Sequence, residues 1–184
     1  MVRISRSIVV LGVLGFIAPG LPALADSKPP AEIVRVPIPN SDFPISLAVR
    51  VPPQAETIYF SGIPSPVTNP AAPKDSPEAY GDTQTQATAV FERLKGALES
   101  QGLTPGDVVS LTVYLVGDPA KGGKLDFPGL QAAYTKYFGT ADQPNKPART
   151  TVQVAALAAP NVLVEIQATA AKLPAQKERH RAAK

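Results

Sequence analysis

Two charged side chains, Arg149 and Glu165, occupy positions from which they could act on a small molecule. Arg149 precedes TTVQVAAL, a segment that alternates like a half-buried strand from Thr151 onward. A guanidinium stays charged at any relevant pH and matches a carboxylate through two parallel hydrogen bonds. From spacing alone, the simpler interpretation is an arginine in a surface or interface salt bridge, with Glu165 as a candidate partner.

Glu165 lies in VLVEIQATA, which also has the alternation of a strand. One face would carry Val162, Val164, Ile166 and Ala168, and the other Leu163, Glu165, Gln167 and Thr169. A carboxylate beside a cationic site can polarise an attacking water and then pass on a proton. The alternative is a carboxylate on a solvated strand face.

The composition excludes several other kinds of chemistry. The chain has no cysteine, and its one histidine, His180, lies in the polar C-terminal segment. Thiol catalysis and thiolate metal sites are therefore excluded, and serine triads, histidine acid–base pairs and multi-histidine metal sites are disfavoured. We expect no metal and no cofactor.

The first 25 residues have the pattern of a cleavable signal peptide. Arg3 and Arg6 form a basic start, an apolar run extends from Ile8 to Ile17, and Ala23-Leu24-Ala25 is an A-x-A cleavage site. The apolar run is too short to span a bilayer, which disfavours a retained membrane anchor. We therefore expect cleavage after Ala25 and export, most simply to a bacterial periplasm.

The positive charge of the chain is confined to its two ends. The formal charge is +3, of which Arg3 and Arg6 supply two. Residues 172–184 hold five basic residues and Glu178, so they carry +4 and predict a disordered basic tail. The remaining body, residues 26–171, is then about −3, which disfavours nucleic-acid binding by that body.

Residues 26–171 are numerous enough to form one domain with a hydrophobic core. Strand-like patterns occur around EIVRV and at residues 45–51, 57–61, 108–116, from 151 onward, and 162–169. Five prolines lie between residues 63 and 80, without apolar periodicity. This segment predicts an ordered but irregular surface loop.

Two segments have the periodicity of amphipathic helices. The first begins near Thr83, which could form a capping box with Gln86, and it ends before Gly102. Its predicted buried residues are Ala87, Val90, Phe91, Leu94 and Leu98. The second covers about residues 127–138 after the N-cap Asp126, and its predicted buried residues are Leu130, Ala133, Tyr134 and Tyr137. The order β-β-β-α-β-α-β-β predicts an α+β fold, with two helices packed on one face of a mixed sheet.

These segments resemble the Rid (reactive intermediate deaminase) family, also called YjgF-like, from about Ile45 to Ala170. The pieces occur in the family's order: Ser61-Gly62 at a strand end, GLTPGDVVSLTVYLVGD, F-x-x-L-Q-A-A-Y with YFGT, and KPARTTVQVAALAAPNVLVEIQATA. The last piece is the most specific. The resemblance implies a chorismate-mutase-like fold and a homotrimer with three sites at subunit interfaces.

The resemblance also implies an activity, because enzymes of this family hydrolyse 2-imino acids and their enamine tautomers to 2-keto acids and ammonia. By resemblance, Arg149 clamps the substrate carboxylate and Glu165 lies near the catalytic water. The backbone carbonyl of Thr151 would hold the imine nitrogen, and Ser61 would hydrogen-bond to substrate or water. Gln131 would lie on the face of the second helix that borders the neighbouring subunit's site.

The chain departs from the family pattern in its expected pocket lining. The familiar G-P-Y is absent, no tyrosine occurs around residues 43–46, and Gln167 stands where a second glutamate is common. The loop after Gly62 is longer than in the compact deaminases. The alternative function is therefore a non-catalytic trimer of the same fold that binds small carboxylates or acts as a holdase.

Overall fold

The computed structural model describes residues 31–174. The predicted signal peptide and the predicted tail, apart from residues 172–174, lie outside the described residues. In chain order the elements are β1 Val34–Pro37, β2 Ser46–Arg50, β3 Glu56–Pro64, α1 Pro77–Tyr80, α2 Thr83–Ser100, η1 Pro105–Asp107, β4 Val108–Val116, η2 Pro119–Lys121, α3 Phe127–Tyr134, β5 Ala148–Val154 and β6 Val164–Lys172.

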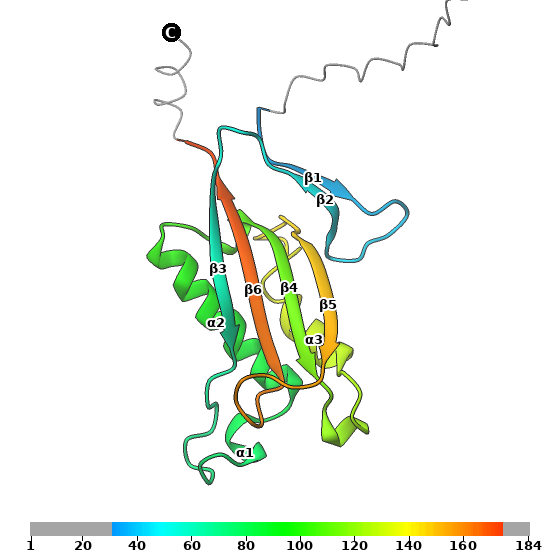
Figure 1. The fold of residues 1–184 in the computed structure, drawn as a ribbon. Helices are drawn as coiled ribbons and strands as arrows, with labels where there is room; N and C mark the ends of the chain where they lie inside the picture. The colour runs from blue at the N-terminus through cyan, green and yellow to red at the C-terminus, as the bar shows by residue number, and fades with distance from the viewer. Residues whose placement is uncertain (1–30, 175–184) are drawn as a thin grey trace, which may run out of the picture.

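The main sheet contains four strands in the order β3-β6-β4-β5 (Figure 1). Strands β4 and β5 are parallel, whereas β6 is antiparallel to both of its neighbours. Strands β1 and β2 form a separate antiparallel pair beside the end of the sheet where β4 and β5 begin (Figure 1). The mixed sheet expected from the sequence is therefore confirmed.

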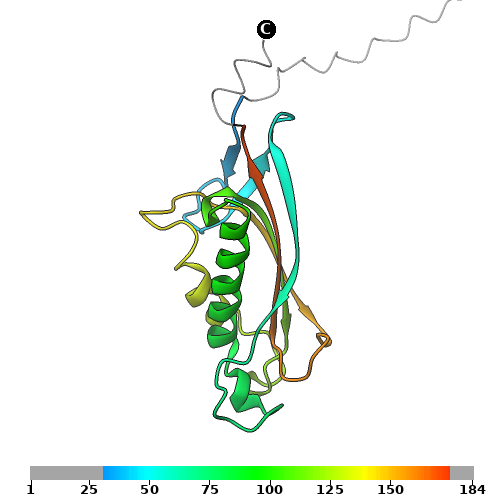
Figure 2. The ribbon, with the colours of Figure 1, turned by 90° about the vertical axis from the view of Figure 1, so that its left-hand side faces the viewer.

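The long helix α2 and the shorter α3 lie on one face of this sheet (Figure 2). The predicted apolar stripes of both helices are buried against β4 and β6, apart from Tyr137, which is half-buried. No described helix covers the opposite face, where Tyr59 is 78% exposed and Val152 is 38% exposed. The predicted α+β arrangement is thus confirmed, with one sheet face packed and the other open.

Some element boundaries differ from the predicted ones. Helix α3 stops at Tyr134 instead of near residue 138, because the N–H groups of Lys136 and Tyr137 bond to carbonyls three residues back. Strand β3 continues to Pro64 through a bulge, and β6 begins at Val164. Lys172, which we assigned to the tail, is the last residue of β6.

The predicted capping box between Thr83 and Gln86 is wrong. The N-cap of α2 is Asp82, whose carboxylate accepts a 2.8 Å hydrogen bond from the Thr85 N–H. The Gln86 side chain is fully buried and bonds outside its own helix. Its Nε2 donates to the Asn161 carbonyl at 3.0 Å, and its Oε1 accepts from a main-chain N–H just before β6. Gln86 therefore ties the start of α2 to the sheet instead of capping the helix.

The proline-rich segment is ordered and largely irregular, as predicted. Between β3 and α1 it has no regular element, yet the N–H groups of Thr68 and Asn69 both donate to the Ala79 carbonyl. The Ser65 and Ala79 side chains are buried. Among the helices of residues 31–174, none is both long and apolar enough to cross a membrane.

Candidate functional site

Arg149 is enclosed by aromatic rings on the helix-bearing side of the sheet. It is the second residue of β5 and lies beside Leu111 of β4, which faces the core. Its Cζ atom is 4.2 Å from the ring centre of Tyr134, 5.5 Å from that of Phe43 and 5.6 Å from that of Phe127. We call Phe43, Phe127 and Tyr134 the aromatic enclosure of Arg149. Ring faces attract a guanidinium, so the enclosure orients this charge.

The guanidinium of Arg149 is only partly satisfied by hydrogen bonds. Its Nη2 donates to Oε1 of Gln131 at 3.1 Å. Its Nη1 is buried and has no hydrogen-bond partner among residues 31–174. Burial lowers the pKa of Arg149, and the neighbouring Tyr134 partly opposes this effect. An arginine nevertheless remains charged at neutral pH. A buried charged donor without an acceptor favours the binding of an anion.

The main chain in front of Arg149 is fixed from two sides. The Ser46 hydroxyl donates to the Lys146 carbonyl at 2.6 Å, and the Ser46 N–H donates to the Pro147 carbonyl at 2.9 Å. Arg35 of β1 also donates to the Lys146 carbonyl at 2.9 Å, and its other bonds reach the start of β4. The β1–β2 pair therefore fixes the main chain at the start of β5, and with it the direction in which the Arg149 side chain points.

Two of the other predicted site residues lie beside Arg149. Thr151 is on the same face of β5, two positions further, and its buried Oγ1 has no hydrogen-bond partner among the described residues. Gln131 lies on α3 and bonds to Arg149 directly. Arg149, Thr151 and Gln131 therefore form one group, which we call the arginine group.

Ser61 and Glu165 belong to a second group, on β3 and β6. Ser61 and Gly62 lie in a bulge where the register of β3 against β6 shifts. A Cβ atom at Gly62 would collide with the carboxylate of Glu165, so a larger residue there would displace this carboxylate from its place over β3. Glu165 is half-buried and Ser61 is exposed. We call Ser61, Gly62 and Glu165 the glutamate group.

The two groups lie on opposite faces of the sheet. Arg149 is beside Leu111 of β4, whereas Glu165 is beside Tyr114 of the same strand. Residues 111 and 114 are an odd number of positions apart, so their side chains point to opposite faces. A salt bridge between Arg149 and Glu165 of one chain is therefore wrong, and no ion pair within residues 31–174 includes either residue.

Sequence reasoning missed the aromatic enclosure. Tyr134 was predicted only as a core residue, and Phe43 and Phe127 were not predicted to lie near Arg149. Phe127, Gln131 and Tyr134 fall at i, i+4 and i+7, so the sequence did hold a signal that these three share one helical face. Phe43 comes from the loop between β1 and β2, and no local pattern marks it.

Comparisons with known proteins agree with this fold. Residues 42–172 match the protein family described as Endoribonuclease L-PSP. A RutC family protein from Pyrococcus horikoshii is 37% identical over 103 residues, which cover 56% of this chain and 73% of that protein. The 2-iminobutanoate/2-iminopropanoate deaminase of Escherichia coli K12 is 33% identical over 103 residues, again 56% of this chain and 73% of that enzyme.

A solved structure shares the fold as well. The structure of a protein of unknown function from the conserved Rid protein family of Yersinia pestis aligns with a TM-score of 0.55. The two sequences are 27% identical, and the alignment covers 75% of this chain and 98% of that one. The fold is therefore that of the YjgF-like α+β proteins. The chain belongs to the Endoribonuclease L-PSP family, which includes the RutC and Rid proteins.

Proposed function

We propose that this protein hydrolyses 2-imino acids and their enamine tautomers to 2-keto acids and ammonia. The observation that carries the proposal is the partly unsatisfied guanidinium of Arg149 inside its aromatic enclosure. Substrates of this class carry a carboxylate, which supplies the acceptor that the buried Nη1 lacks. The Escherichia coli relative is named for its action on 2-iminobutanoate and 2-iminopropanoate, which supports this substrate class.

Substrate entry requires a movement in the aromatic enclosure. Nη1 has essentially no exposed surface in this conformation, so a carboxylate reaches it only when a neighbouring side chain moves. Phe43 and Phe127 are both half-buried, but Phe127 and Tyr134 belong to α3, whereas Phe43 lies on the irregular β1–β2 loop. We assign the movement to Phe43. The imine nitrogen then lies near the Thr151 carbonyl, and Gln131 helps to hold the carboxylate.

The complete site needs a second copy of the chain. Arg149 and Glu165 of one chain point to opposite sheet faces, and the face that carries Glu165 is open. A homotrimer in which each open face meets the arginine group of a neighbour would bring the two groups together three times. Closed rotational symmetry makes the three sites equivalent.

In this composite site the chemistry needs one water molecule and no cofactor. Glu165 of one chain accepts a proton from water as the oxygen forms a bond to C2 of the imino acid held by Arg149 of the next. Glu165 then passes this proton to the nitrogen, which leaves an amino group and a hydroxyl group on C2. Glu165 next takes the hydroxyl proton and delivers it to the same nitrogen as the C2–N bond breaks, and ammonia leaves. The remaining C2–oxygen bond becomes the carbonyl of the 2-keto acid. Ser61 borders the same water from the glutamate group.

The test is an assay in which an amino-acid oxidase generates 2-imino acids and their decay is followed with and without purified protein. The proposal expects faster decay, and loss of this effect in Arg149→Ala. The matched control is Arg50→Ala, because Arg50 is an exposed arginine on β2, outside both groups. If the protein accelerates the decay of neither aliphatic nor aromatic 2-imino acids, the proposal is wrong.

A second function has one observation in its favour. The arginine group is complete within one chain and can bind a carboxylate without Glu165. A non-catalytic trimer that binds small carboxylates, or acts as a holdase, needs no more than this. Tight binding of 2-keto acids without any faster imine decay would establish the binding function in place of the deaminase.

We also propose that the protein is exported with residues 1–25 removed. The basic start, the short apolar run and the A-x-A site support this proposal. Fractionation of a bacterial host and mass spectrometry of the chain should find a periplasmic protein that begins at Asp26. An uncleaved chain that remains with the cytoplasm or the membrane would contradict it.

A further inference from the structure

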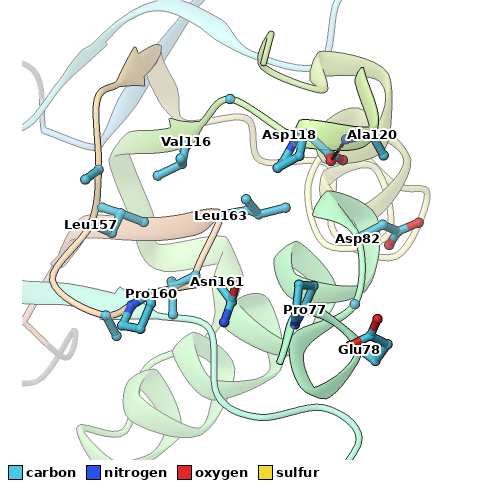
Figure 3. Close-up of a pocket in the computed structure, with 16 residues that line it drawn as sticks. Pro77, Glu78, Asp82, Val116, Asp118, Ala120, Leu157, Pro160, Asn161 and Leu163 are labelled. Carbon is cyan, nitrogen blue, oxygen red and sulfur yellow. Dashed lines mark hydrogen bonds between the residues drawn. The ribbon is translucent and has the colours of Figure 1, made fainter. Parts of the chain in front are cut away.

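A cavity of about 520 Å³ lies away from both groups of predicted site residues (Figure 3). Its wall comes from three segments: residues 77–82 from α1 to the N-cap of α2, residues 116–120 at the end of β4 and just after it, and residues 156–163 between β5 and β6. Arg149 lies beside Leu111, and the cavity begins five positions further along β4, roughly 16 Å away. Neither Arg149 nor Glu165 lines it.

Most of the cavity wall is apolar. The side chains of Leu157 and Leu163 project toward its centre, with Pro160 beside them and Pro77 on the opposite side (Figure 3). Pro77 is the last proline of the proline-rich segment and the first residue of α1, so the end of this segment contributes to the wall. Cavities of roughly 300–1,000 Å³ with mainly apolar walls are typical of small-molecule sites.

The charged side chains in the wall are all acidic. Glu78, Asp82 and Asp118 line the cavity, and none of its lining residues is a lysine, arginine or histidine. Glu78 and Asp82 lie together on one side of the cavity, and Asp118 lies above them beside Ala120 (Figure 3). A ligand in this cavity therefore meets an apolar wall and a negative side.

Two of these carboxylates are held in fixed positions. Asp118 is only 5% exposed, and its Oδ1 accepts from the Ala120 N–H at 2.8 Å. Asp82 accepts from the Thr85 N–H, a bond that lowers the pKa of Asp82, as Lys121 does to a smaller extent. Lys121 does not line the cavity. The negative side is thus preorganised for a cation.

We propose that this cavity binds a small apolar molecule with one positive charge, such as an arylalkylamine. The apolar wall buries the ring, and the carboxylates of Glu78, Asp82 and Asp118 attract the ammonium group. A carboxylate ligand would meet like charges there. This inference does not rest on the proposed function, because the cavity shares no residue with the arginine group or the glutamate group.

The test compares three ligands with the same indole ring: tryptamine, tryptophol and indole-3-acetate. The chain contains no tryptophan, so indole fluorescence reports the ligand without a background from protein tryptophan. Titrations use the Arg149→Ala protein as well as the wild type, so that carboxylate binding at Arg149 does not interfere. Solvated ion pairs contribute modestly, so the Kd of tryptamine should be about three- to tenfold below that of tryptophol. Indole-3-acetate should bind least in Arg149→Ala.

Two kinds of variant locate the binding. Ala120→Phe places a ring at the cavity from an exposed position and should abolish binding of tryptamine and tryptophol alike. Glu78→Gln with Asp82→Asn removes two charges, and asparagine still caps a helix. Asp118 remains, so this double variant should reduce the preference for tryptamine and leave tryptophol unchanged. Glu99→Gln, at the other end of α2, is the control and should change neither.

Three results would overturn the proposal. The first is equal affinity for tryptamine and tryptophol in the wild type. The second is tryptamine binding that survives Ala120→Phe, since the ligand would then lie elsewhere. The third is no saturable binding of any of the three ligands, the result expected if a second copy of the chain fills the cavity. Loss of imine hydrolysis in Arg149→Ala with tryptamine binding intact would separate the two sites.

Discussion

Arg149 combines two properties of the guanidinium group that lysine does not share. Its planar group lies among three aromatic rings, and it has a second nitrogen available after one has bonded to Gln131. The positive charge alone therefore does not account for what the site can bind. A carboxylate held by two parallel hydrogen bonds has a defined orientation, which the proposed imine hydrolysis would need.

Arg149→Lys should therefore lose most carboxylate binding although it keeps the charge. A hydrogen bond to a charged group contributes about 1.5–3 kcal/mol, so we expect affinity for 2-oxobutanoate to fall about ten- to 100-fold. Isothermal titration calorimetry measures this, with Arg50→Lys as the matched control. Unchanged affinity in Arg149→Lys would show that charge alone is sufficient.

At the scale of elements, the start of α2 depends on Asp82, which the sequence pattern did not identify. Asp82→Ala should lower the free energy of unfolding by about 1 kcal/mol, and Asp82→Asn by much less, since asparagine caps as well. Urea unfolding of the three proteins at neutral pH measures the difference. An Asp82→Ala protein as stable as the wild type would contradict the capping role.

The same cap predicts a pH dependence. The pKa of Asp82 is lowered in the folded chain, chiefly by the bond from Thr85. Its contribution to stability is therefore complete above the unfolded-state pKa of about 4 and is lost as pH falls through the folded-state pKa. The stability difference between wild type and Asp82→Asn should change in this acidic range and stay constant above it.

The β1–β2 pair is the second element whose role emerges from the structure. Arg35 donates to main-chain carbonyls of Gly106, Val108 and Lys146, all at 2.9 Å, and it lies before the residues that match the family. Arg35→Met should cost about 2–4 kcal/mol, because these carbonyls lose a charged donor. It should also weaken 2-oxobutanoate binding, because the entrance of β5 loosens.

Urea unfolding and hydrogen exchange at residues 145–150 test this role of Arg35, with Arg50→Met on the neighbouring strand as the control. Faster exchange confined to that segment and to its partners is the expected result. An Arg35→Met protein with wild-type binding and exchange would show that the pair is not needed to hold Arg149.

At the scale of the whole molecule, Arg149 and Glu165 lie on opposite faces of the sheet. We therefore expect a result from mixed oligomers that a site contained within one chain would not give. Arg149→Ala and Glu165→Gln should each be inactive alone. Mixed oligomers from coexpression should regain about a quarter of wild-type activity, because in random equal mixing one site in four combines an intact arginine group with an intact glutamate group. The imine assay on coexpressed and separately purified proteins measures this. No recovery in proven mixed oligomers would contradict a site shared between chains.

Much of the fold could be predicted from the sequence because its signals are local. Strand β4 follows directly from the alternation in VVSLTVYLV, and the N-cap Asp126 precedes α3 as expected. The end of α3 could not be predicted, because apolar residues continue to Phe138 while the backbone tightens after Tyr134. The capping box failed because Gln86 bonds to a segment distant in sequence, and propensity does not encode such a partner.

The sequence by itself supplied the candidate site residues, since short motifs that resemble the Rid family point to Arg149, Gln131, Thr151, Ser61 and Glu165. Only the tertiary structure decided how they are grouped. Arg149 and Glu165 pair with residues of β4 that are three positions apart, so their side chains point to opposite faces of the sheet. This arrangement depends on how β4, β5 and β6 pair, which the sequence does not show. The aromatic enclosure and the acidic cavity likewise join loops far apart in the chain, and contacts of that kind leave no periodic pattern in a sequence.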